Sequence, residues 1–206
     1  MKKVGIIDYG MGNISSVANA LKYLGADFEV TNSSKEIKNF YSLIIPGVGS
    51  FRKAMNNLQE LNFIDEINNE VLIKKKNILG ICLGMQLMSS SSTEDGDTKG
   101  LGLIKNKVTK LILKKENNLR VPHVGFNNII SFTNNFNLFK KIKEKSNFYF
   151  NHSYKMKLEN NNKYAACNYG EEFLAAFQKE NIFGVQFHPE KSQSNGLQLI
   201  SNFINI

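Results

Sequence analysis

In the first half of the chain, short apolar runs alternate with segments of helical spacing, and glycines mark most of the changes between them. Apolar runs bounded by turn residues predict buried strands, and apolar residues three to four positions apart predict helices. The predicted strands are 2–8, 27–32, 42–51 (ending in a Gly-rich loop) and 77–82, and the predicted helices are 13–25, 51–75 and 84–90. This alternation predicts a parallel, doubly wound α/β sheet.

From Leu101 onward the pattern changes to short strands, some of them antiparallel. They are predicted at 107–113, 128–132, 147–153, 163–170, 172–178 and 182–188, and a helix at 195–204 follows them. The 206 residues contain no repeat and no Pro-rich or Gly/Ser-rich linker, and the Ser-rich stretch 89–93 is predicted to be a loop. We therefore expect one sizeable domain, 1–206.

The composition argues against several classes of function. The net charge is +8, but the positive residues are scattered lysines with only Arg52 and Arg120 as arginines. This favours a solvated surface over a nucleic-acid site. No apolar stretch approaches the roughly 20 residues of a membrane span, and residues 1–9 are too short and polar for a signal peptide. Two cysteines without a C-x-x-C pattern indicate a reducing cytoplasm.

Three Gly-rich loops follow predicted strands of the first half: Gly10–Asn13, Pro46–Gly49 and Cys82–Gly84. Open α/β sheets bind ligands beyond the carboxyl ends of their strands. We expect the three loops to gather at one rim of the sheet.

Cys82 lies in the segment Gly80–Gly84, which has the form G-x-nucleophile-x-G. This pattern is typical of a strained strand-to-helix elbow, where glycines let neighbouring backbone pass close by. The helix N-terminus that follows favours a thiolate. A free cysteine is also commonly buried without a chemical role. The elbow alone leaves both interpretations open.

His188 is the best candidate for a base that serves Cys82. It ends an apolar strand, and Pro189 biases it toward an extended conformation. Glu190 then points the same way as His188, so it can accept the ring N–H and fix the tautomer. One cysteine and one histidine with a paired carboxylate make a poor zinc site, so we expect no metal.

The loops at Pro46–Gly49 and Gly10–Asn13 are less specific. Backbone N–H groups of the first could form an oxyanion hole, although an ordinary strand-to-helix turn explains it equally well. The second has a G-x-G-x-x-S pattern, but a dinucleotide site wants an acidic residue after the second strand. This chain has Thr31 and Asn32 there, so we expect no dinucleotide cofactor.

Taken together, these stretches carry a family resemblance. "GICLGMQL" with "FHPE" resembles the class I, triad-type glutamine amidotransferases. "YGMGN", "VPHVGFN" and "HPEKSQ" are similar to a branch of that family, the glutaminase subunits of imidazole glycerol phosphate synthases. The resemblance implies a flavodoxin-like fold, no cofactor, and hydrolysis of glutamine to glutamate and ammonia.

The resemblance also implies roles for individual residues. Cys82 would attack the carboxamide, His188 would protonate the departing ammonia, and Glu190 would orient His188. Backbone amides of Leu83 and of the loop with Gly47, Val48 and Gly49 would stabilise the oxyanion. The residues implied to hold the α-amino and α-carboxyl groups of glutamine are Gln86, Glu94, Ser153 and Tyr154. His152 is predicted to be a structural residue beside the substrate-binding loop at Ser153 and Tyr154. Cys167 is predicted to lie in a strand and to be buried in the core.

The resemblance further implies a partner, a (β/α)₈ cyclase in a 1:1 heterodimer, which receives the ammonia and makes imidazole glycerol phosphate and an aminoimidazole ribotide. The implied interface residues are Asn13, His123, Phe126 and Lys191. The family usually has Trp where this chain has Phe126, and the chain contains no Trp. The alternatives are a paralogue that supplies ammonia to a surface sugar, a stand-alone cysteine hydrolase or peptidase, and a non-enzymatic binding module.

Overall fold

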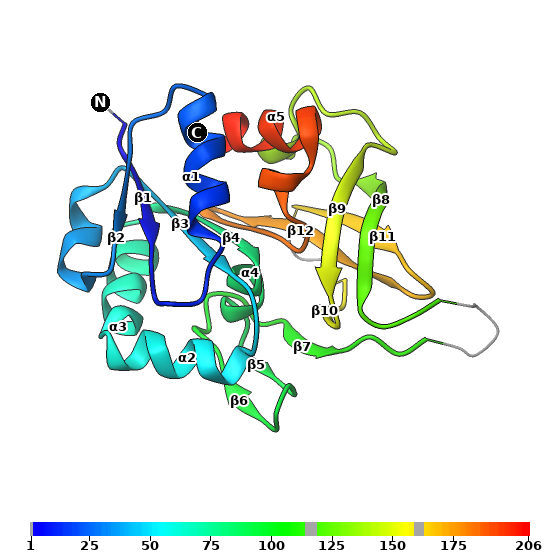
Figure 1. The fold of residues 1–206 in the computed structure, drawn as a ribbon, viewed down its shortest axis with the longest axis horizontal. Coiled ribbons are helices and arrows are strands. Elements are labelled where there is room, and N and C mark those ends of the chain that lie inside the picture. Colours follow the sequence, from blue (N-terminus) through cyan, green and yellow to red (C-terminus); the bar gives the residue numbers. More distant parts are fainter. Residues whose placement is uncertain (1, 114–118, 159–162) are drawn as a thin grey trace.

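A computed structural model describes residues 2–113, 119–158 and 163–206 (Figure 1). The first half alternates strand and helix, as predicted. Its elements are β1 (Val4–Ile7), α1 (Ile14–Tyr23), β2 (Phe28–Thr31), η1 (Ser34–Asn39), β3 (Ser42–Gly47), α2 (Phe51–Glu60), α3 (Phe63–Asn68), η2 (Asn69–Ile73), β4 (Asn77–Cys82) and α4 (Leu83–Leu87).

The second half consists mainly of strands and ends in a helix, also as predicted. Its elements are β5 (Ser91–Ser92), β6 (Thr98–Lys99), β7 (Lys107–Lys110), β8 (His123–Phe132), η4 (Asn137–Phe139), β9 (Asn147–His152), β10 (Tyr154–Met156), β11 (Lys163–Asn168), β12 (Glu172–Lys179), β13 (Ile182–Val185), η5 (Pro189–Lys191) and α5 (Gln193–Ile204). Strand β8 begins five residues before the predicted 128–132, because residues 123–128 pair with β9.

The main sheet has nine strands in the order β2-β1-β3-β4-β13-β12-β11-β8-β9. Its first five strands pair in parallel, and the remaining pairs are antiparallel. The parallel part has the flavodoxin-like order, with β13 as the fifth strand. The predicted α/β fold with additional strands in the C-terminal half is confirmed. A smaller sheet has the order β10-β7-β5-β6.

Helices cover both faces of the parallel part, as predicted (Figure 1). Helices α1 and α5 pack on one face, where Leu21 and Phe203 join a buried cluster with Ile6 and Ile81. Helices α2, α3 and α4 pack on the other face. The alternation of side chains along each strand supplies apolar residues to both clusters, which fixes the sheet between two helical layers.

Two predictions about secondary structure are wrong. The single helix predicted over 51–75 is interrupted between α2 and α3, because Asn62 adopts a left-handed conformation (φ 57°) that ends one helix and starts the next. Asparagine tolerates this conformation better than most residues. The last part of the predicted helix, η2, is a π-helical turn that follows α3 directly. The loop predicted over 89–93 contains β5, which pairs with β6 and β7.

The three Gly-rich loops do gather at one rim of the sheet. The Val48 N–H donates to the Met11 carbonyl oxygen at 3.1 Å, which joins the first two loops. The Tyr9 hydroxyl donates to the Pro46 carbonyl at 2.7 Å. Gly47 is the parallel partner of Cys82, so the second and third loops leave the sheet side by side. No helix among the described residues is long and apolar enough to cross a membrane.

Candidate active site

Cys82 occupies a sharp turn between β4 and α4, with φ 53° and ψ −110°. A non-glycine residue in such a region stores about 1–3 kcal/mol of strain. The glycines around it are needed for space. A Cβ at Gly84 would lie 1.8 Å from the Ile45 carbonyl oxygen, and one at Gly80 would lie 2.7 Å from the carbonyl group of Gly84. This is the close backbone approach expected of an elbow.

His188 and Glu190 form a buried pair beside this turn. The Nδ1 atom of His188 lies 2.8 Å from Oε1 of Glu190, and the two side chains are 3% and 1% exposed. Pro189 begins the short η5 turn and leaves His188 extended, at φ −100° and ψ 95°. The His188 N–H also donates to the Tyr149 carbonyl at 2.8 Å, which fixes this segment to β9.

The surroundings of His188 favour its charged form. Burial disfavours the imidazolium, but the interactions with Cys82 and Glu190 outweigh it and raise the pKa of His188 to about 10. An imidazolium is therefore held between a sulfur and a carboxylate at neutral pH. The structure brings Cys82, His188 and Glu190 together, and their catalytic roles remain predictions.

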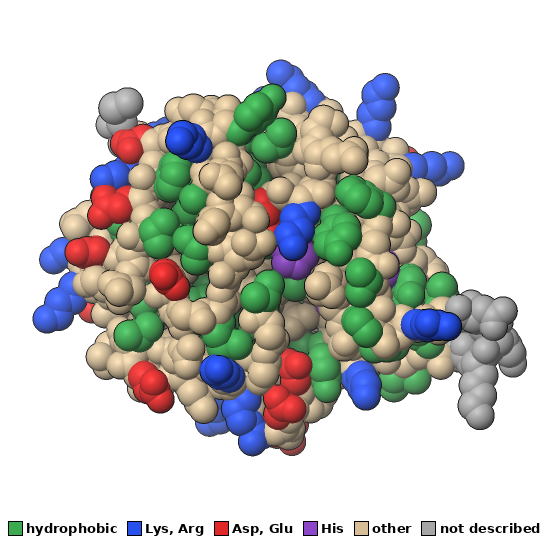
Figure 2. Space-filling view, viewed as in Figure 1, with side chains coloured by type: hydrophobic (Ala, Val, Ile, Leu, Met, Phe, Trp, Pro, Cys, Tyr) green, Lys and Arg blue, Asp and Glu red, His purple; other side chains and the backbone are tan. Residues whose placement is uncertain are grey.

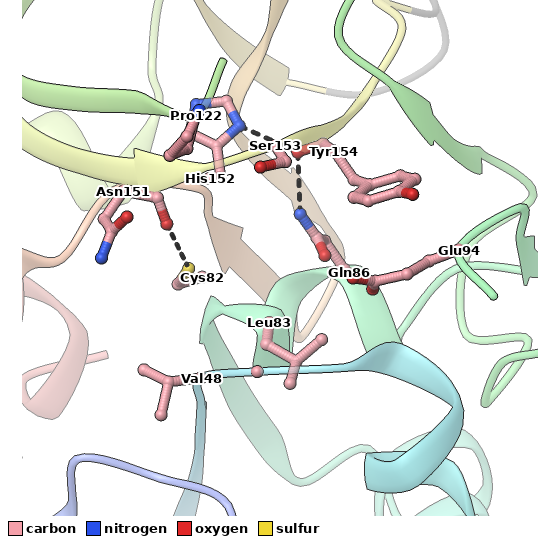
Figure 3. A pocket seen from close by; sticks show the side chains of 11 residues that line it. Val48, Cys82, Leu83, Gln86, Glu94, Pro122, Asn151, His152, Ser153 and Tyr154 are labelled. Carbon is pink, nitrogen blue, oxygen red and sulfur yellow. Dashed lines mark hydrogen bonds between the residues drawn. The ribbon is translucent and has the colours of Figure 1, made fainter.

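The Cys82 sulfur opens into a pocket of about 300 Å³ (Figure 3). Seven of the eight residues predicted to bind substrate line it, namely Val48, Gly49, Leu83, Gln86, Glu94, Ser153 and Tyr154. Gly47 does not line it. A Cβ at Gly47 would lie 2.4 Å from the Tyr9 hydroxyl and 2.8 Å from the Leu83 Cβ, so this residue packs behind the pocket wall.

Gln86 and Glu94 offer acceptor atoms to this pocket. The amide nitrogen of Gln86 donates to the Tyr154 carbonyl at 2.9 Å and to Oε1 of Gln186 at 3.0 Å. Its carbonyl oxygen is therefore the atom left to accept from a ligand. One carboxylate oxygen of Glu94 accepts from the Phe51 N–H at 2.9 Å. Burial raises the pKa of Glu94, so a positively charged ligand group would stabilise its ionised form.

In the Pro46–Gly49 loop, which is expected to supply oxyanion donors, one of the backbone N–H groups is already hydrogen-bonded. The Val48 N–H is occupied by the Met11 carbonyl, in the neighbouring loop. Gly49 follows with φ 102°, a conformation that favours glycine. Val48 itself is 42% exposed. As it stands, the Val48 N–H is not free to stabilise a charge beside Cys82.

His152, which lines the pocket, forms a buried hydrogen-bonded chain with His123 behind it. The Nδ1 atom of His152 donates to the Tyr154 carbonyl at 2.8 Å (Figure 3), so its Nε2 accepts from Nδ1 of His123 at 3.1 Å. Nε2 of His123 then accepts from Asn127 at 3.3 Å. Burial lowers the pKa of His123 to about 4 and that of His152 to about 3, so both rings are neutral.

The interface prediction for His123 does not agree with its position. The ring is 2% exposed. It is stacked between Phe150 and Tyr169, with ring centroids at 4.8 and 3.9 Å. Its partner in β9 is His152, across the β8–β9 ladder. The side chain of His123 therefore supports the pocket wall and is not available on the surface.

The other predicted interface residues are accessible. Phe126 is 50% exposed and meets Tyr149 edge to face at 5.6 Å, and the Lys191 ammonium lies 5.8 Å from the centre of the same Tyr149 ring. Asn13 is half-buried at the start of α1. Figure 2 draws one face of the molecule, on which a histidine is visible beside a Lys or Arg and several hydrophobic side chains.

Sequence reasoning missed three residues of the site, Pro122, Asn151 and Gln186. Pro122, Asn151 and His152 line the pocket, although only His152 had been expected near it. Gln186 lies beneath it, fully buried, with its amide nitrogen 3.8 Å from the Cys82 sulfur. Gln186 had a visible signal, because it is a polar residue inside an apolar strand. No comparable signal marks Asn151, whose carbonyl faces the sulfur at 3.7 Å.

This geometry agrees with a family match that spans nearly the whole chain. Residues 5–206 match the model of the family described as glutamine amidotransferase class-I, and the chain belongs to that family. Its relatives include "Imidazole glycerol phosphate synthase subunit HisH 1" of Campylobacter jejuni strain RM1221, 43% identical over 98% of this chain and 100% of the relative. Subunit HisH 2 of Methanococcus maripaludis is 45% identical over 98% of both chains.

Solved structures support the fold. A crystal structure described as glutamine amidotransferase superposes with a TM-score of 0.75 at 16% identity, covering 98% of this chain and 97% of the other. The structure of PurLQS from Thermotoga maritima gives a TM-score of 0.69 at 18% identity, over 100% of this chain and 99% of the other. At these identities the likeness shows the fold alone.

Proposed function

We propose that the chain is the glutaminase subunit of an imidazole glycerol phosphate synthase, which hydrolyses glutamine to glutamate and ammonia for histidine biosynthesis. The observation that carries this proposal is the elbow cysteine next to the buried His188–Glu190 pair, in a pocket with acceptors for an amino acid. Relatives that match over the full length and carry the HisH name support the same pathway. They do not favour the surface-sugar or stand-alone hydrolase alternatives.

The reaction follows from the position of each group. The Cys82 thiolate attacks the carboxamide carbon, and the oxygen becomes an oxyanion that the Leu83 N–H and an N–H of the Pro46–Gly49 loop stabilise. The His188 imidazolium donates its proton to the amide nitrogen, which leaves as ammonia. Neutral His188 then takes a proton from water, which hydrolyses the thioester to glutamate and regenerates Cys82. Glu190 holds the tautomer and stabilises the imidazolium throughout.

The pocket suits the two charged groups of a free amino acid. The α-ammonium group finds acceptors in the Gln86 carbonyl oxygen and the Glu94 carboxylate. Hydroxyl and backbone donors of Ser153 and Tyr154 suit the α-carboxylate. Pairing with an ammonium group also offsets the burial that raises the pKa of Glu94. This arrangement favours glutamine over a glutamine side chain inside a peptide.

The ammonia acceptor is proposed to be a (β/α)₈ cyclase in a 1:1 complex, because the relatives are named as subunits of a synthase. Asn13, Phe126 and Lys191 are the surface residues we propose for this interface. We also propose that 1–206 acts as a single glutamine amidotransferase domain, and that it works in the cytoplasm without a cofactor.

The test is an assay of glutamate release from glutamine by the purified chain, alone and with a histidine-pathway cyclase and its ribotide ligand. We expect turnover with the liganded cyclase, and loss of that turnover in Cys82→Ala, while the mutant complex still uses free ammonium salt. No glutamate release with any liganded cyclase would refute the proposal. Release that is equally fast without a partner would favour a stand-alone hydrolase.

A further inference from the structure

Gln186 is a polar side chain with no exposure to solvent, at the point where β13 leaves the sheet. Strands β13 and β4 run parallel, with Val185 opposite Ile81. The residues that follow Val185 and Ile81 are Gln186 and Cys82, so the register sets the amide beside the elbow. Side chains alternate along a strand, and Gln186 points to the same face as Gly184, whose Cβ position is filled by the Phe177 ring and by Met85 of α4.

Both ends of the Gln186 amide are engaged. Its nitrogen lies 3.8 Å from the Cys82 sulfur as a donor, and its oxygen accepts from the Gln86 nitrogen at 3.0 Å. The Tyr154 carbonyl fixes the orientation of Gln86, because only an N–H group can donate to it. If the Gln186 amide were turned over, two N–H groups would face each other. The network therefore aims an N–H of Gln186 at the sulfur.

We propose that Gln186 is a positioning residue for Cys82, which donates a hydrogen bond to its sulfur and connects the nucleophile to the substrate-binding wall through Gln86. The inference rests on the proposed function, in which Cys82 is the nucleophile. A buried amide is costly unless both its donor and acceptor are used, and here the sulfur is one of those partners. A purely structural role would require the Gln186 N–H to donate to another group of the protein in place of the Cys82 sulfur.

The hydrogen bond matters most for the thiolate. As a thiol, Cys82 can donate to the Asn151 carbonyl at 3.7 Å while accepting from Gln186. As a thiolate it no longer donates, and the Asn151 oxygen repels it. The Gln186 N–H then remains as an uncharged donor to the negative sulfur, beside the charged His188. A donor to the charged form favours that form.

The experiment measures the rate of Cys82 alkylation by iodoacetamide as a function of pH in Gln186→Glu and Gln186→Met. The first keeps the shape but places an acceptor against the sulfur, and the second has a similar volume and removes the donor without adding charge. Gln59→Glu, on the exposed side of α2, controls for the change in total charge. Cys167 is fully buried, so it does not compete for the reagent.

We expect the pH midpoint of alkylation to rise by about one unit or more in Gln186→Glu, so that about tenfold less thiolate reacts at a fixed pH. Gln186→Met should give a smaller rise and Gln59→Glu none. Midpoints that coincide with the wild-type value in the folded variants would overturn the inference, even if their stability falls. If Gln186→Glu does not fold, Gln186→Met decides the question alone.

Glutaminase turnover separates this inference from the proposed function. A wild-type chain that releases no glutamate with any liganded cyclase would refute the proposed function, whatever the alkylation profiles show. An active wild-type chain whose variants keep both its alkylation profile and its kcat would refute the role of Gln186 alone. An active wild-type chain whose variants lose kcat and shift the alkylation midpoint supports both.

Discussion

Replacing Val48 by proline removes the backbone N–H that the Met11 carbonyl occupies in this structure. If that N–H must turn toward the pocket to stabilise the oxyanion, the variant has no donor at this position in either orientation. Proline fits the local backbone, because Val48 has a negative φ and Gly47 before it is extended in β3. We expect Val48→Pro to fold and to bind its partner.

The expected loss of turnover and the expected activation by the partner can both be worked out from the structure. Losing one oxyanion donor lowers turnover by about 10²–10³. The Val48–Met11 hydrogen bond contributes about 0.5–1.5 kcal/mol to the resting orientation. A hundredfold activation by the partner requires about 2.7 kcal/mol of differential stabilisation, which lies within the range of about 1–3 kcal/mol typical of allosteric coupling. We therefore expect the isolated chain to be nearly inactive and the liganded partner to raise its turnover at least about a hundredfold.

The assay is steady-state glutamate release with and without the liganded cyclase, at saturating glutamine. In Val48→Pro the stimulated turnover should fall by about 10²–10³ toward the unstimulated rate. Val48→Ala is the matched control, because it keeps the N–H and removes a side chain that is 42% exposed. A Val48→Pro enzyme that the partner still activates a hundredfold would refute the reasoning, as would equal wild-type rates with and without the partner.

Four further predictions rest on other contacts. Glu190→Gln removes the charge beside the His188 imidazolium at 2.8 Å and should lower stimulated turnover by several orders of magnitude, as exchange of a triad carboxylate for an amide does by about 10⁴; turnover like that of the wild type would make Glu190 a structural residue only. Gly84→Ala places a Cβ 1.8 Å from the Ile45 carbonyl and should destabilise the fold by at least about 1–3 kcal/mol. Urea unfolding should show a larger loss for it than for Gly25→Ala, where nothing lies within 4 Å of the added atom. Because burial lowers the pKa of His123 to about 4 and of His152 to about 3, the unfolded chain binds more protons below about pH 6.5. Stability should therefore fall as the pH drops from 6.5 toward 4, and less so in His123→Gln; equal slopes in both proteins would contradict this assignment. Phe126→Ala removes a half-exposed aromatic side chain and should raise the Kd for the cyclase while leaving the intrinsic chemistry of Cys82 intact; an unchanged Kd would remove Phe126 from the interface.

Local chemistry explains why much of the fold could be predicted from the sequence. Strands β1 and β4 are short apolar runs that end in glycine-containing turns, so their type follows from periodicity, and their parallel direction follows from the helices between strands. The elbow at Cys82 was recognisable because only glycine fits at Gly80 and Gly84. The contact between His188 and Glu190 was recognisable because it spans two residues of extended chain.

Features that depend on pairing between distant segments were not predictable in the same way. The exposed face of β8 carries Phe126, but the position of His123 depends on its pairing with β9 and on the rings that stack on it. Gln186 lies beside Cys82 because of the register between β13 and β4, which no local pattern states. The break at Asn62 also escaped prediction, because the helical spacing of apolar residues continues across it.

The site divides into a fixed part and an adjustable part. Cys82, His188 and Glu190 are buried, and their positions are set by β4, by the ladder to Tyr149 and by the η5 turn. The Val48 peptide lies at the exposed rim, is held by a single hydrogen bond between two loops and is followed by a glycine with positive φ. A group that contacts the rim can therefore turn this peptide without disturbing Cys82, His188 and Glu190, provided that it favours the turned orientation by about 2.7 kcal/mol, which a hundredfold activation requires. This difference in stability gives a surface partner a physical route to control Cys82, the proposed nucleophile.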